Sequence, residues 1–306
     1  MLDGSLSIDF DNAWAYRRAA GEQDWETSPS FLGIAAPRIV DVLDRCGLPL
    51  TVFVVGRDLD DDRDADVIRG LLDRPDVEAA NHTVNHLPWL HTLAPEEVDA
   101  EIRGTHERLL ALGRRPIGFR GPGFSCPPVV LRTLAELDYA YDASSFPTSI
   151  APLARAVFLS RCKLTGPERE RASAMYGGWS SALKSNRPHA RNDGIDAEVP
   201  VTTMPLLRTP IHLSYLTFLA GHSVVVAKAY FNAAMTLCRI TRTSPSLLLH
   251  PPDFLGCDDV TGLDGFPGMS LSRRDKLVFT GWVLDRFSRR FRVRTMGDFV
   301  AEHFSV

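Results

Sequence analysis

Cysteine is scarce in this sequence, and the few cysteines are far apart. The five of them form no CxxC pair and are odd in number: Cys46, Cys126, Cys162, Cys238 and Cys257. A disulfide framework or a thiolate metal site would need closely spaced pairs, so the spacing argues against both. The sequence also lacks a basic start followed by an apolar core and a cleavage site. We therefore expect no signal peptide and a reducing, cytoplasmic location.

An excess of charge and a long apolar run are also missing. The formal net charge is -4 at pH 7, which gives no basic surface for nucleic acid. Residues 211–238 carry one charged residue, yet polar residues interrupt them before the ~18 apolar residues of a membrane span are reached. We expect a buried helix pair there, with a lipid-binding pair as the alternative. The 306 residues are 44% hydrophobic and can fill one domain over residues 1–306.

Strand and helix patterns alternate along the sequence. Alternating or β-branched runs predict strands at residues 5–10, 51–55, 77–80, 117–119, 139–141 and 247–250. Helical spacing predicts helices over residues 34–47, 66–72, 94–113, 128–137 and 271–287. This alternation implies parallel strands, in a doubly wound sheet or a barrel. We prefer the barrel, because acids, histidines and an arginine directly follow the strands.

Two histidines and two aspartates stand at predicted strand ends. His82 and His86 are four residues apart, and one helical turn would put both imidazoles on one face, where they could bind zinc. The same spacing also fits an ordinary polar helix face. Asp9 and Asp11 point to one side of a strand, into a pocket or into water. One aspartate with the two histidines would complete a metal site with open positions, and the other would be free as a base.

Three further stretches each have an ordinary interpretation when taken alone. Arg120 lies among glycines in GFRGPGF, which also suits a turn with a surface charge. Asp142 follows a short predicted strand, and His250 opens the sequence HPPD at another strand end. Asp253 in that sequence could cap the following turn. Their shared position after strands makes all of them candidates for one site.

Together and in this order, these stretches resemble the polysaccharide deacetylase family, also known as the NodB-homology or carbohydrate esterase family 4 deacetylases. The HTxxH, RGPG and LHPPD motifs carry the resemblance, over residues 5–147 and 247–300. It implies a distorted (β/α)7 barrel, with a helical or lid insertion at about residues 151–246. It also implies metal-dependent removal of an N-acetyl group from an N-acylated amino sugar.

The resemblance also implies a role for individual residues. Asp11, His82 and His86 would bind the metal. Asp9 would be the general base, with Arg120 as its partner. His250 would be the general acid, and Asp142 would orient it. The role of Asp253 stays open. A set of two histidines and an aspartate suits zinc, while cobalt, nickel, manganese or iron would also bind there.

The first motif departs from the family pattern. The usual motif has adjacent aspartates followed by glycine, whereas Asp9 and Asp11 are separated by a residue and no glycine follows. This form is similar to the start of deformylases that act on undecaprenyl-phosphate-linked aminoarabinose, so deformylation of a lipid-linked sugar is an alternative activity. A non-catalytic carbohydrate- or lipid-binding module is a third reading, which the complete set of catalytic residue types argues against.

A lipid-linked substrate would need a groove, a phosphate contact and peripheral contact with a membrane. Residues 211–238 could shape the groove, and the phosphate could lie near Arg208 or near the set Arg286, Arg289 and Arg290. The alternative is that the helices pack on the barrel and the arginines are solvated.

Tryptophans and a run of acids complete the candidates. Trp14, Trp25 and Trp89 could stack on a sugar ring or pack in the core. The acids between Asp58 and Asp66 lack the glycine of an EF-hand loop, so we expect a solvated loop at a helix start.

Overall fold

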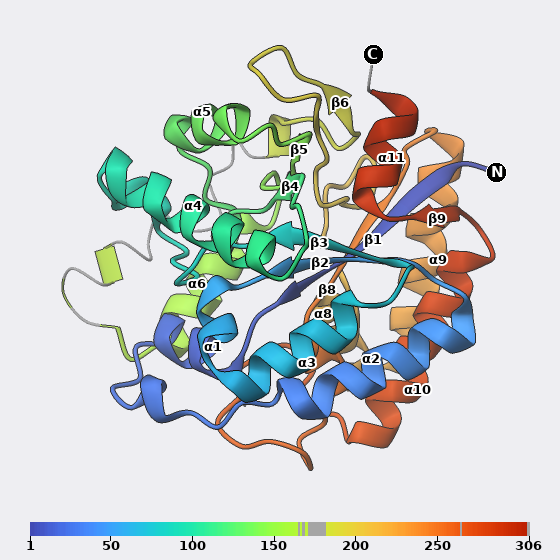
Figure 1. Ribbon diagram of the computed structural model, residues 1–306. Helices are drawn as coiled ribbons and strands as arrows, with labels where there is room; N and C mark the ends of the chain where they lie inside the picture. The colour runs from blue at the N-terminus through green and yellow to red at the C-terminus, as the bar shows by residue number, and fades with distance from the viewer. Residues whose placement is uncertain (165, 167–168, 171–181, 264, 305–306) are drawn as a thin grey trace.

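A curled sheet runs through the middle of the molecule, with helices packed around it (Figure 1). The structure is a computed structural model that describes residues 1–164, 166, 169–170, 182–263 and 265–304. Its strands are β1 (Asp3–Phe10), β2 (Leu50–Val54), β3 (Val77–Asn81), β4 (Gly118–Phe119), β5 (Tyr141–Asp142), β6 (His189–Ala190), β7 (Ala197–Glu198), β8 (Ser246–Leu249) and β9 (Arg292–Arg294). Their order is β6-β7-β5-β4-β3-β2-β1-β8, and β9 pairs with the start of β1.

Helices follow most strands and cover the sheet. They are α1 (Ala13–Ala19), α2 (Leu32–Cys46), α3 (Asp62–Leu72), α4 (Pro95–Ala111), α5 (Pro128–Glu136), α6 (Ala151–Arg161), α8 (Leu213–His222), α9 (Val224–Ile240), α10 (Arg273–Ser288) and α11 (Met296–His303). Short 3-10 helices are η1 (Trp25–Thr27), η2 (Gly56–Asp60), η3 (Leu90–Thr92), η4 (Pro122–Phe124) and η6 (Pro251–Phe254). Among the described helices, none has the length and apolarity to cross a membrane.

Seven neighbouring strands, from β7 through β5, β4, β3, β2 and β1 to β8, run parallel. The loop after β7 bridges the gap to β8, because the N–H of Thr202 donates to the carbonyl of Ser246 at 3.1 Å. The N–H of Ser246 donates in turn to Thr202 Oγ1 at 2.8 Å. The predicted distorted (β/α)7 barrel of the NodB-homology type is therefore confirmed.

Local chemistry explains where several elements begin and end. The helix α2 ends at Gly47, whose φ of 60° is the left-handed conformation that glycine adopts most easily. At the start of α4, the side chain of Glu97 accepts the N–H of Ala94 at 2.8 Å, and Pro95 opens the first turn. These boundaries follow the sequence prediction closely.

Residues 151–246 contribute to the barrel as well as to its periphery. This stretch contains the seventh parallel strand, β7, and the helix pair α8 and α9. The pair buries Leu216, Phe231 and Met235 in the main core, so the buried helix pair predicted here is confirmed. Much of the predicted lid, at residues 165, 167–168 and 171–181, lies outside the described residues.

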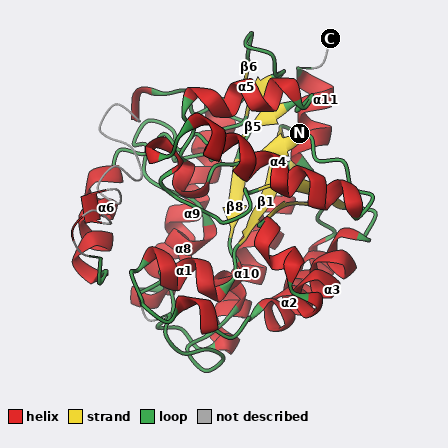
Figure 2. Ribbon diagram, turned by 60° about the vertical axis from the view of Figure 1, so that its left-hand side comes forward, coloured by secondary structure: helices red, strands yellow, loops and turns green. Residues whose placement is uncertain are grey.

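The carboxyl ends of the parallel strands meet at one end of the barrel. They point to the left in Figure 1, and Figure 2 turns this side toward the viewer. The helices α1 and α6 lie at this end (Figure 2). Side chains that follow the strands are brought together here.

Glu78 joins four elements near the opposite end. Its carboxylate accepts hydrogen bonds from Thr51 Oγ1 at 2.7 Å, the Gly297 N–H at 2.8 Å and the Tyr141 hydroxyl at 2.8 Å.

We predict that Glu78→Ala lowers the free energy of unfolding by about 3 kcal/mol, because three donors lose their acceptor. Urea denaturation measures this loss. A loss no larger than that of Glu107→Ala, on the exposed side of α4, would contradict it.

Candidate metal centre and catalytic pocket

Asp9 lies on β1, between β2 and β8, and Asp11 directly follows this strand. Every residue of β1 is buried, and Asp9 and Asp11 are only 5% and 3% exposed. The side chain of Asn12 accepts the Ala13 N–H at 2.8 Å and so starts α1 directly after Asp11. Both carboxylates approach His82 Nε2, at 3.8 Å and 3.5 Å, so they face the same side as the two-residue period of a strand predicts.

His82 and His86 lie in a loop after β3. The expectation that a helical turn aligns them is wrong, since Thr83 and His86 have φ values of 64° and 48°. The loop folds back on itself through a hydrogen bond from the His86 N–H to Thr83 Oγ1 at 3.1 Å. His82 Nε2 and His86 Nε2 then lie 3.5 Å and 3.2 Å from Asp11 Oδ1. The loop achieves the convergence that the helix was expected to provide.

Two residues outside the motifs support this loop. The carboxylate of Glu101 accepts the Asn85 N–H at 2.7 Å and the Asn85 Nδ2 at 2.6 Å. Arg18 Nη2 donates to the His86 carbonyl at 2.9 Å. These contacts offset the cost of left-handed backbone at two residues that are not glycine. Sequence reasoning missed Glu101 and Arg18, because nothing in their local sequence marks them.

The tryptophans of this region pack in the protein. The guanidinium of Arg18 lies 5.1 Å from the ring centroid of Trp14 and 5.0 Å from that of Trp25. Trp14 is 7% exposed and donates its indole N–H to Asp58 Oδ1 at 2.7 Å. Packing therefore accounts for Trp14. Trp89 packs against Leu164 and its neighbours.

Two acids of the predicted solvated run are buried. Asp58 and Asp64 are 3% and 7% exposed, and Asn12 Nδ2 donates to them at 3.1 Å and 2.8 Å. Burial raises the pKa of Asp58 to about 7. The prediction of a solvated loop is wrong for these two acids, which fix Asn12 beside Asp11. Asp61 does cap α3, accepting the N–H groups of Arg63 and Asp64.

The ligand atoms of Asp11, His82 and His86 fit a small divalent ion. All three lie within 4.8 Å of one another. Around a tetrahedral ion with ligands ~2.1 Å away, neighbouring ligand atoms lie roughly 3.4 Å apart. The two distances to Asp11 Oδ1, 3.5 Å and 3.2 Å, agree with this geometry. Asp11 Oδ1 and His82 Nε2 are also buried without a hydrogen bond, which an ion would satisfy.

The surroundings hold these side chains in the form that binds metals. His82 Nδ1 lies 2.6 Å from the Arg120 carbonyl, which places its proton there and leaves Nε2 free as a ligand. Burial lowers the pKa of His82, so the ring stays neutral. Burial alone would raise the pKa of Asp11, but its interactions with His86 outweigh burial and hold that pKa well below its ordinary value. The carboxylate is therefore ionised.

A second group of possible ligands is already neutralised. Asp3, Glu302 and His303 lie together at the start of β1. Asp3 accepts two hydrogen bonds from Arg292, which lowers its pKa to about 2. Because arginine occupies this carboxylate, we do not assign the cluster to a metal.

Arg120 connects the metal set to Asp9. It is completely buried, and its Nη1 donates to Asp9 Oδ1 at 2.6 Å. Its Nε and Nη2 donate to the Ala143 carbonyl and to Ser7 Oγ, both at 3.1 Å. The other oxygen of Asp9, Oδ2, lies 3.8 Å from His82 Nε2 and 3.9 Å from His250 Nε2. Asp9 thus lies between the candidate ligands and His250.

His250 is oriented by Ser214 and Asp253. Its Nδ1 lies 3.0 Å from Ser214 Oγ, which donates to Asp253 Oδ2 at 3.1 Å. The same carboxylate oxygen accepts the backbone N–H of His250 at 2.8 Å. Burial raises the pKa of Asp253, although His250 partly offsets this. Sequence reasoning left Asp253 open and missed Ser214, which α8 supplies from a distant part of the chain.

The predicted pairing of Asp142 with His250 does not form. Asp142 Oδ1 accepts the N–H and the hydroxyl of Ser144 at 3.1 Å and 2.5 Å. Ser144 Oγ accepts the Gly121 N–H at 2.8 Å, so Asp142 shapes the glycine-rich turn after Arg120. Among the described residues, the carboxylates that form ion pairs with His250 belong to Asp9 and Asp253. Burial raises the pKa of Asp142 to about 6.

Half-buried rings surround His250, and we call them the aromatic rim: Tyr16, Phe124, Phe146, His212 and Phe266. On one side of His250, its ring centroid lies 6.5 Å from that of His212, which lies 5.4 Å from that of Phe146, and Phe146 and Phe124 are 4.8 Å apart. On the other side, the ring centroid of Phe266 lies 6.0 Å from that of His250 and 5.1 Å from that of Tyr16. Burial lowers the pKa of His212 to about 3, and its buried Nδ1 has no partner. The rim places flat, largely apolar surfaces beside His250.

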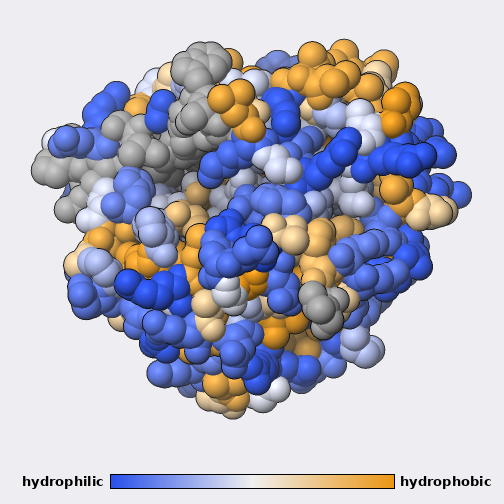
Figure 3. Space-filling model, turned by 90° about the horizontal axis from the view of Figure 1, so that it is seen from above, coloured by the Kyte–Doolittle hydropathy of each residue, from blue (hydrophilic) through white to orange (hydrophobic). Residues whose placement is uncertain are grey.

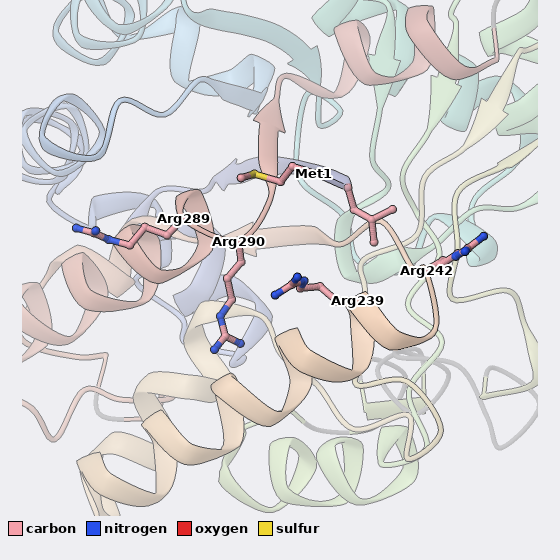
Figure 4. A pocket seen from close by; sticks show the side chains of 6 residues that line it. Met1, Arg239, Arg242, Arg289 and Arg290 are labelled. Atoms are coloured by element: carbon pink, nitrogen blue, oxygen red, sulfur yellow. The ribbon is translucent and has the colours of Figure 1, made fainter.

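The arginines predicted near a phosphate lie in different places. A cavity of ≈ 530 Å³ is lined by Met1, Leu2, Arg239, Arg242, Arg289 and Arg290 (Figure 4). It lies at the amino end of β1, whose eight residues span about 26 Å. Arg289 and Arg290 are therefore far from Asp9, and a phosphate contact by them stays a prediction. Arg286 Nε donates to Asn232 Oδ1 at 2.9 Å. Arg208 lies four residues before His212, at the same end as His250.

Residues 23–141 match the family model described as polysaccharide deacetylase. Over this part, 119 of the 306 residues, the chain is similar to the polysaccharide deacetylase family. The resemblance predicted from the motifs is thereby confirmed. The deacetylase match includes His82, His86 and Arg120, while Asp9, Asp11 and His250 lie outside it. A comparison with curated protein sequences found no match.

Several solved structures share the fold. A putative polysaccharide deacetylase from Mycobacterium smegmatis is 16% identical, with a TM-score of 0.58 over 98% of this chain and 90% of that one. A probable polysaccharide deacetylase from Pseudomonas aeruginosa PAO1 is 14% identical, with a TM-score of 0.57 over 99% and 90%. Puue allantoinase is also 14% identical, with a TM-score of 0.58 over 99% and 89%. At these identities the similarity establishes the fold alone.

We predict that the wild-type chain binds one zinc ion per chain and that Asp11→Ala and His82→Ala abolish this binding, because each removes a ligand from an enclosed site. Metal analysis after equilibrium dialysis measures the stoichiometry. His91→Ala, at an exposed histidine outside the set, serves as the control and should retain the ion. Full occupancy in Asp11→Ala would rule out the assigned ligands.

Proposed function

We propose that this protein is a metal-dependent hydrolase that removes the N-acetyl group from an N-acylated amino sugar. The observation that carries the proposal is the position of Asp9 Oδ2, 3.8 Å from His82 Nε2 and 3.9 Å from His250 Nε2. A candidate base thus lies between a candidate metal ligand and a candidate acid. A bound divalent ion, with zinc best suited to the donors, would polarise the acyl group and make water more acidic.

Asp9 is placed to act as the general base. Its Oδ1 is held by Arg120, so Oδ2 remains to accept a proton from the attacking water. Arg120 also balances the negative charge of Asp9 in a buried position. The hydrogen bond at 2.6 Å fixes the direction of the carboxylate, which keeps Oδ2 turned toward the pocket.

His250 is placed to act as the general acid. In the network His250–Ser214–Asp253, the Nδ1 proton is donated to Ser214 Oγ, and the Ser214 hydroxyl donates to Asp253. This leaves His250 Nε2 free to protonate the leaving amine. The carboxylate of Asp253 stabilises the positive charge of the ring before the proton is transferred.

Two alternative functions use the same pocket. The separated aspartates of the first motif favour deformylation of a lipid-linked formamido sugar, which needs the same base and acid on a smaller acyl group. A non-catalytic carbohydrate- or lipid-binding module is the other alternative. It would not require a carboxylate and an imidazole as close as Asp9 Oδ2 and His250 Nε2, 3.9 Å apart, so the geometry favours an enzyme.

A lipid-linked substrate finds support in exposed apolar side chains. Phe218, Val224, Val225 and Val226 are 39%, 42%, 78% and 57% exposed. They lie around the turn between α8 and α9. Because α9 ends close to the amino end of β8, its first residues lie toward the carboxyl end of β8, where His250 is found. On the face seen in Figure 3, hydrophobic areas are separated by hydrophilic side chains. Peripheral membrane contact and a cytoplasmic location remain predictions.

We predict that the wild type releases an acyl group from at least one of three candidates: a chitooligosaccharide, a nucleotide-linked N-acetylhexosamine, and a polyprenyl-phosphate hexosamine in N-acetyl and N-formyl forms. Mass spectrometry of the products measures the loss. Asp9→Asn should reduce the rate about 10³-fold by removing the base. Asp62→Asn, on the exposed start of α3, should leave it unchanged. If no candidate loses an acyl group, the hydrolase proposal fails and the binding module gains support.

We further predict that Ser214→Ala lowers kcat about tenfold with KM and metal content unchanged, because His250 loses the link to Asp253 that orients it. Steady-state kinetics and metal analysis test this result. Thr236→Ala, at an exposed threonine on α9, provides the control. Equal kcat values for Ser214→Ala and the control would show that the network does not orient the acid.

A further inference from the structure

The hydroxyl of Tyr16 is buried at the candidate site without a hydrogen-bond partner. Tyr16 lies on α1, five residues after Asp11. Burial and the negative charges of Asp11, Asp253 and Asp9 raise the pKa of this hydroxyl well above its ordinary value, and Asp11 is also near enough to act as a weak hydrogen-bond acceptor. The ring of Tyr16 packs on Phe266, whose own ring centroid lies 6.0 Å from that of His250, so Tyr16 borders the candidate site.

Neighbouring rings fix the ring of Tyr16, but they give its hydroxyl no hydrogen-bond partner. The ring packs edge-on against Phe266 at 5.1 Å and against Phe31 at 6.3 Å. Burying a hydroxyl without a partner costs about 1–3 kcal/mol, which a phenylalanine at this position would avoid. Packing thus explains the ring but not the oxygen. A substrate oxygen that enters beside the hydroxyl would supply a well-aligned partner.

One oxygen of Asp9 and one oxygen of Asp253 are engaged elsewhere. Asp9 Oδ1 accepts from Arg120, and Asp253 Oδ2 accepts from Ser214 and from the His250 backbone. Asp11 is the candidate metal ligand. A phenol is a hydrogen-bond donor at neutral pH, so its proton remains for an oxygen that enters the pocket.

We propose that Tyr16 is a further catalytic residue, whose hydroxyl donates a hydrogen bond to the acyl oxygen of the substrate as negative charge develops on it. The inference rests on the proposed function. Water adds to the acyl carbon and gives its proton to Asp9, the C–N bond breaks, and His250 protonates the amine. The phenol keeps its own proton throughout and stabilises the oxyanion.

A merely structural role would have a different signature. If the hydroxyl serves to orient Asp11, its loss would weaken metal binding, since outer-shell partners of ligands are typically worth about 10- to 100-fold in affinity. If it contacts the acyl oxygen, its loss would reduce turnover and leave metal binding intact. The two roles are therefore separable by measuring both quantities.

The experiment compares Tyr16→Phe with Tyr230→Phe. The hydroxyl of Tyr230 has partners within the protein, Thr209 Oγ1 at 2.6 Å and the Pro210 carbonyl at 2.7 Å. We expect Tyr16→Phe to lower kcat about 10²-fold, to keep zinc affinity within about twofold, and not to lower the melting temperature. Tyr230→Phe should lower the melting temperature and leave kcat unchanged, because the hydrogen bonds that it removes, to Thr209 and Pro210, do not involve the candidate catalytic groups.

Acetate binding to the zinc-loaded protein gives a readout that does not depend on the right substrate. Acetate carries the oxygen of the released acyl group, and we expect it to bind about tenfold more weakly to Tyr16→Phe. Unchanged kcat and acetate affinity would overturn the inference, as would a loss of zinc affinity or a wild type that does not bind acetate. Tyr16-dependent acetate binding without turnover of any N-acyl sugar would instead retain the donor and refute the proposed function.

Discussion

The buried ion pair of Asp9 and Arg120 is the interaction on which the candidate site depends. Arg120 is fully enclosed, and its guanidinium is held by Asp9, Ser7 and the Ala143 carbonyl. Removing either charge would leave the other buried without a partner, at a cost of about 3–5 kcal/mol. The carbonyl of Arg120 also fixes the ring of His82. One residue therefore sets the orientation of both the proposed base and a proposed metal ligand.

The rest of the architecture supplies rigid support around this pair. The strands β1, β4 and β8 deliver Asp9, Arg120 and His250 to the same end of the barrel. The histidine loop lies between them and includes two left-handed residues, Thr83 and His86. Contacts from α1 and α4 hold that loop in place. Catalytic groups fixed in this way need little rearrangement when a substrate binds.

Local rules predicted the parts of the site that depend on short stretches of sequence. Strand periodicity placed Asp9 and Asp11 on one side, and the alternation of strands and helices placed His82, Arg120 and His250 at one end. The helical turn expected for the histidines did not form, because the chain folds back through Thr83 and the Glu101 contacts. The resemblance to a family supplied the residues but not their local backbone.

Contacts between distant segments could not be predicted. Asp142 was paired with His250, yet that place is taken by Ser214 and Asp253, and Ser214 comes from a helix that no motif marks. Asp58 was expected in water because its neighbours are acids, but Asn12 and Trp14 enclose it from 46 and 44 residues away. Tyr16 was missed for the same reason, since only the folded chain shows where its hydroxyl points.

The measurement that tests the account most directly is X-ray absorption spectroscopy of the zinc-loaded protein. The account predicts a first shell of nitrogen and oxygen at about 2.0–2.1 Å, with the outer-shell scattering of two imidazole rings, one of which disappears in His86→Ala. The same spectrum should persist in Asp3→Ala, which disrupts the cluster at the start of β1. Sulfur in the first shell, or a spectrum that changes in Asp3→Ala and not in His86→Ala, would contradict the account.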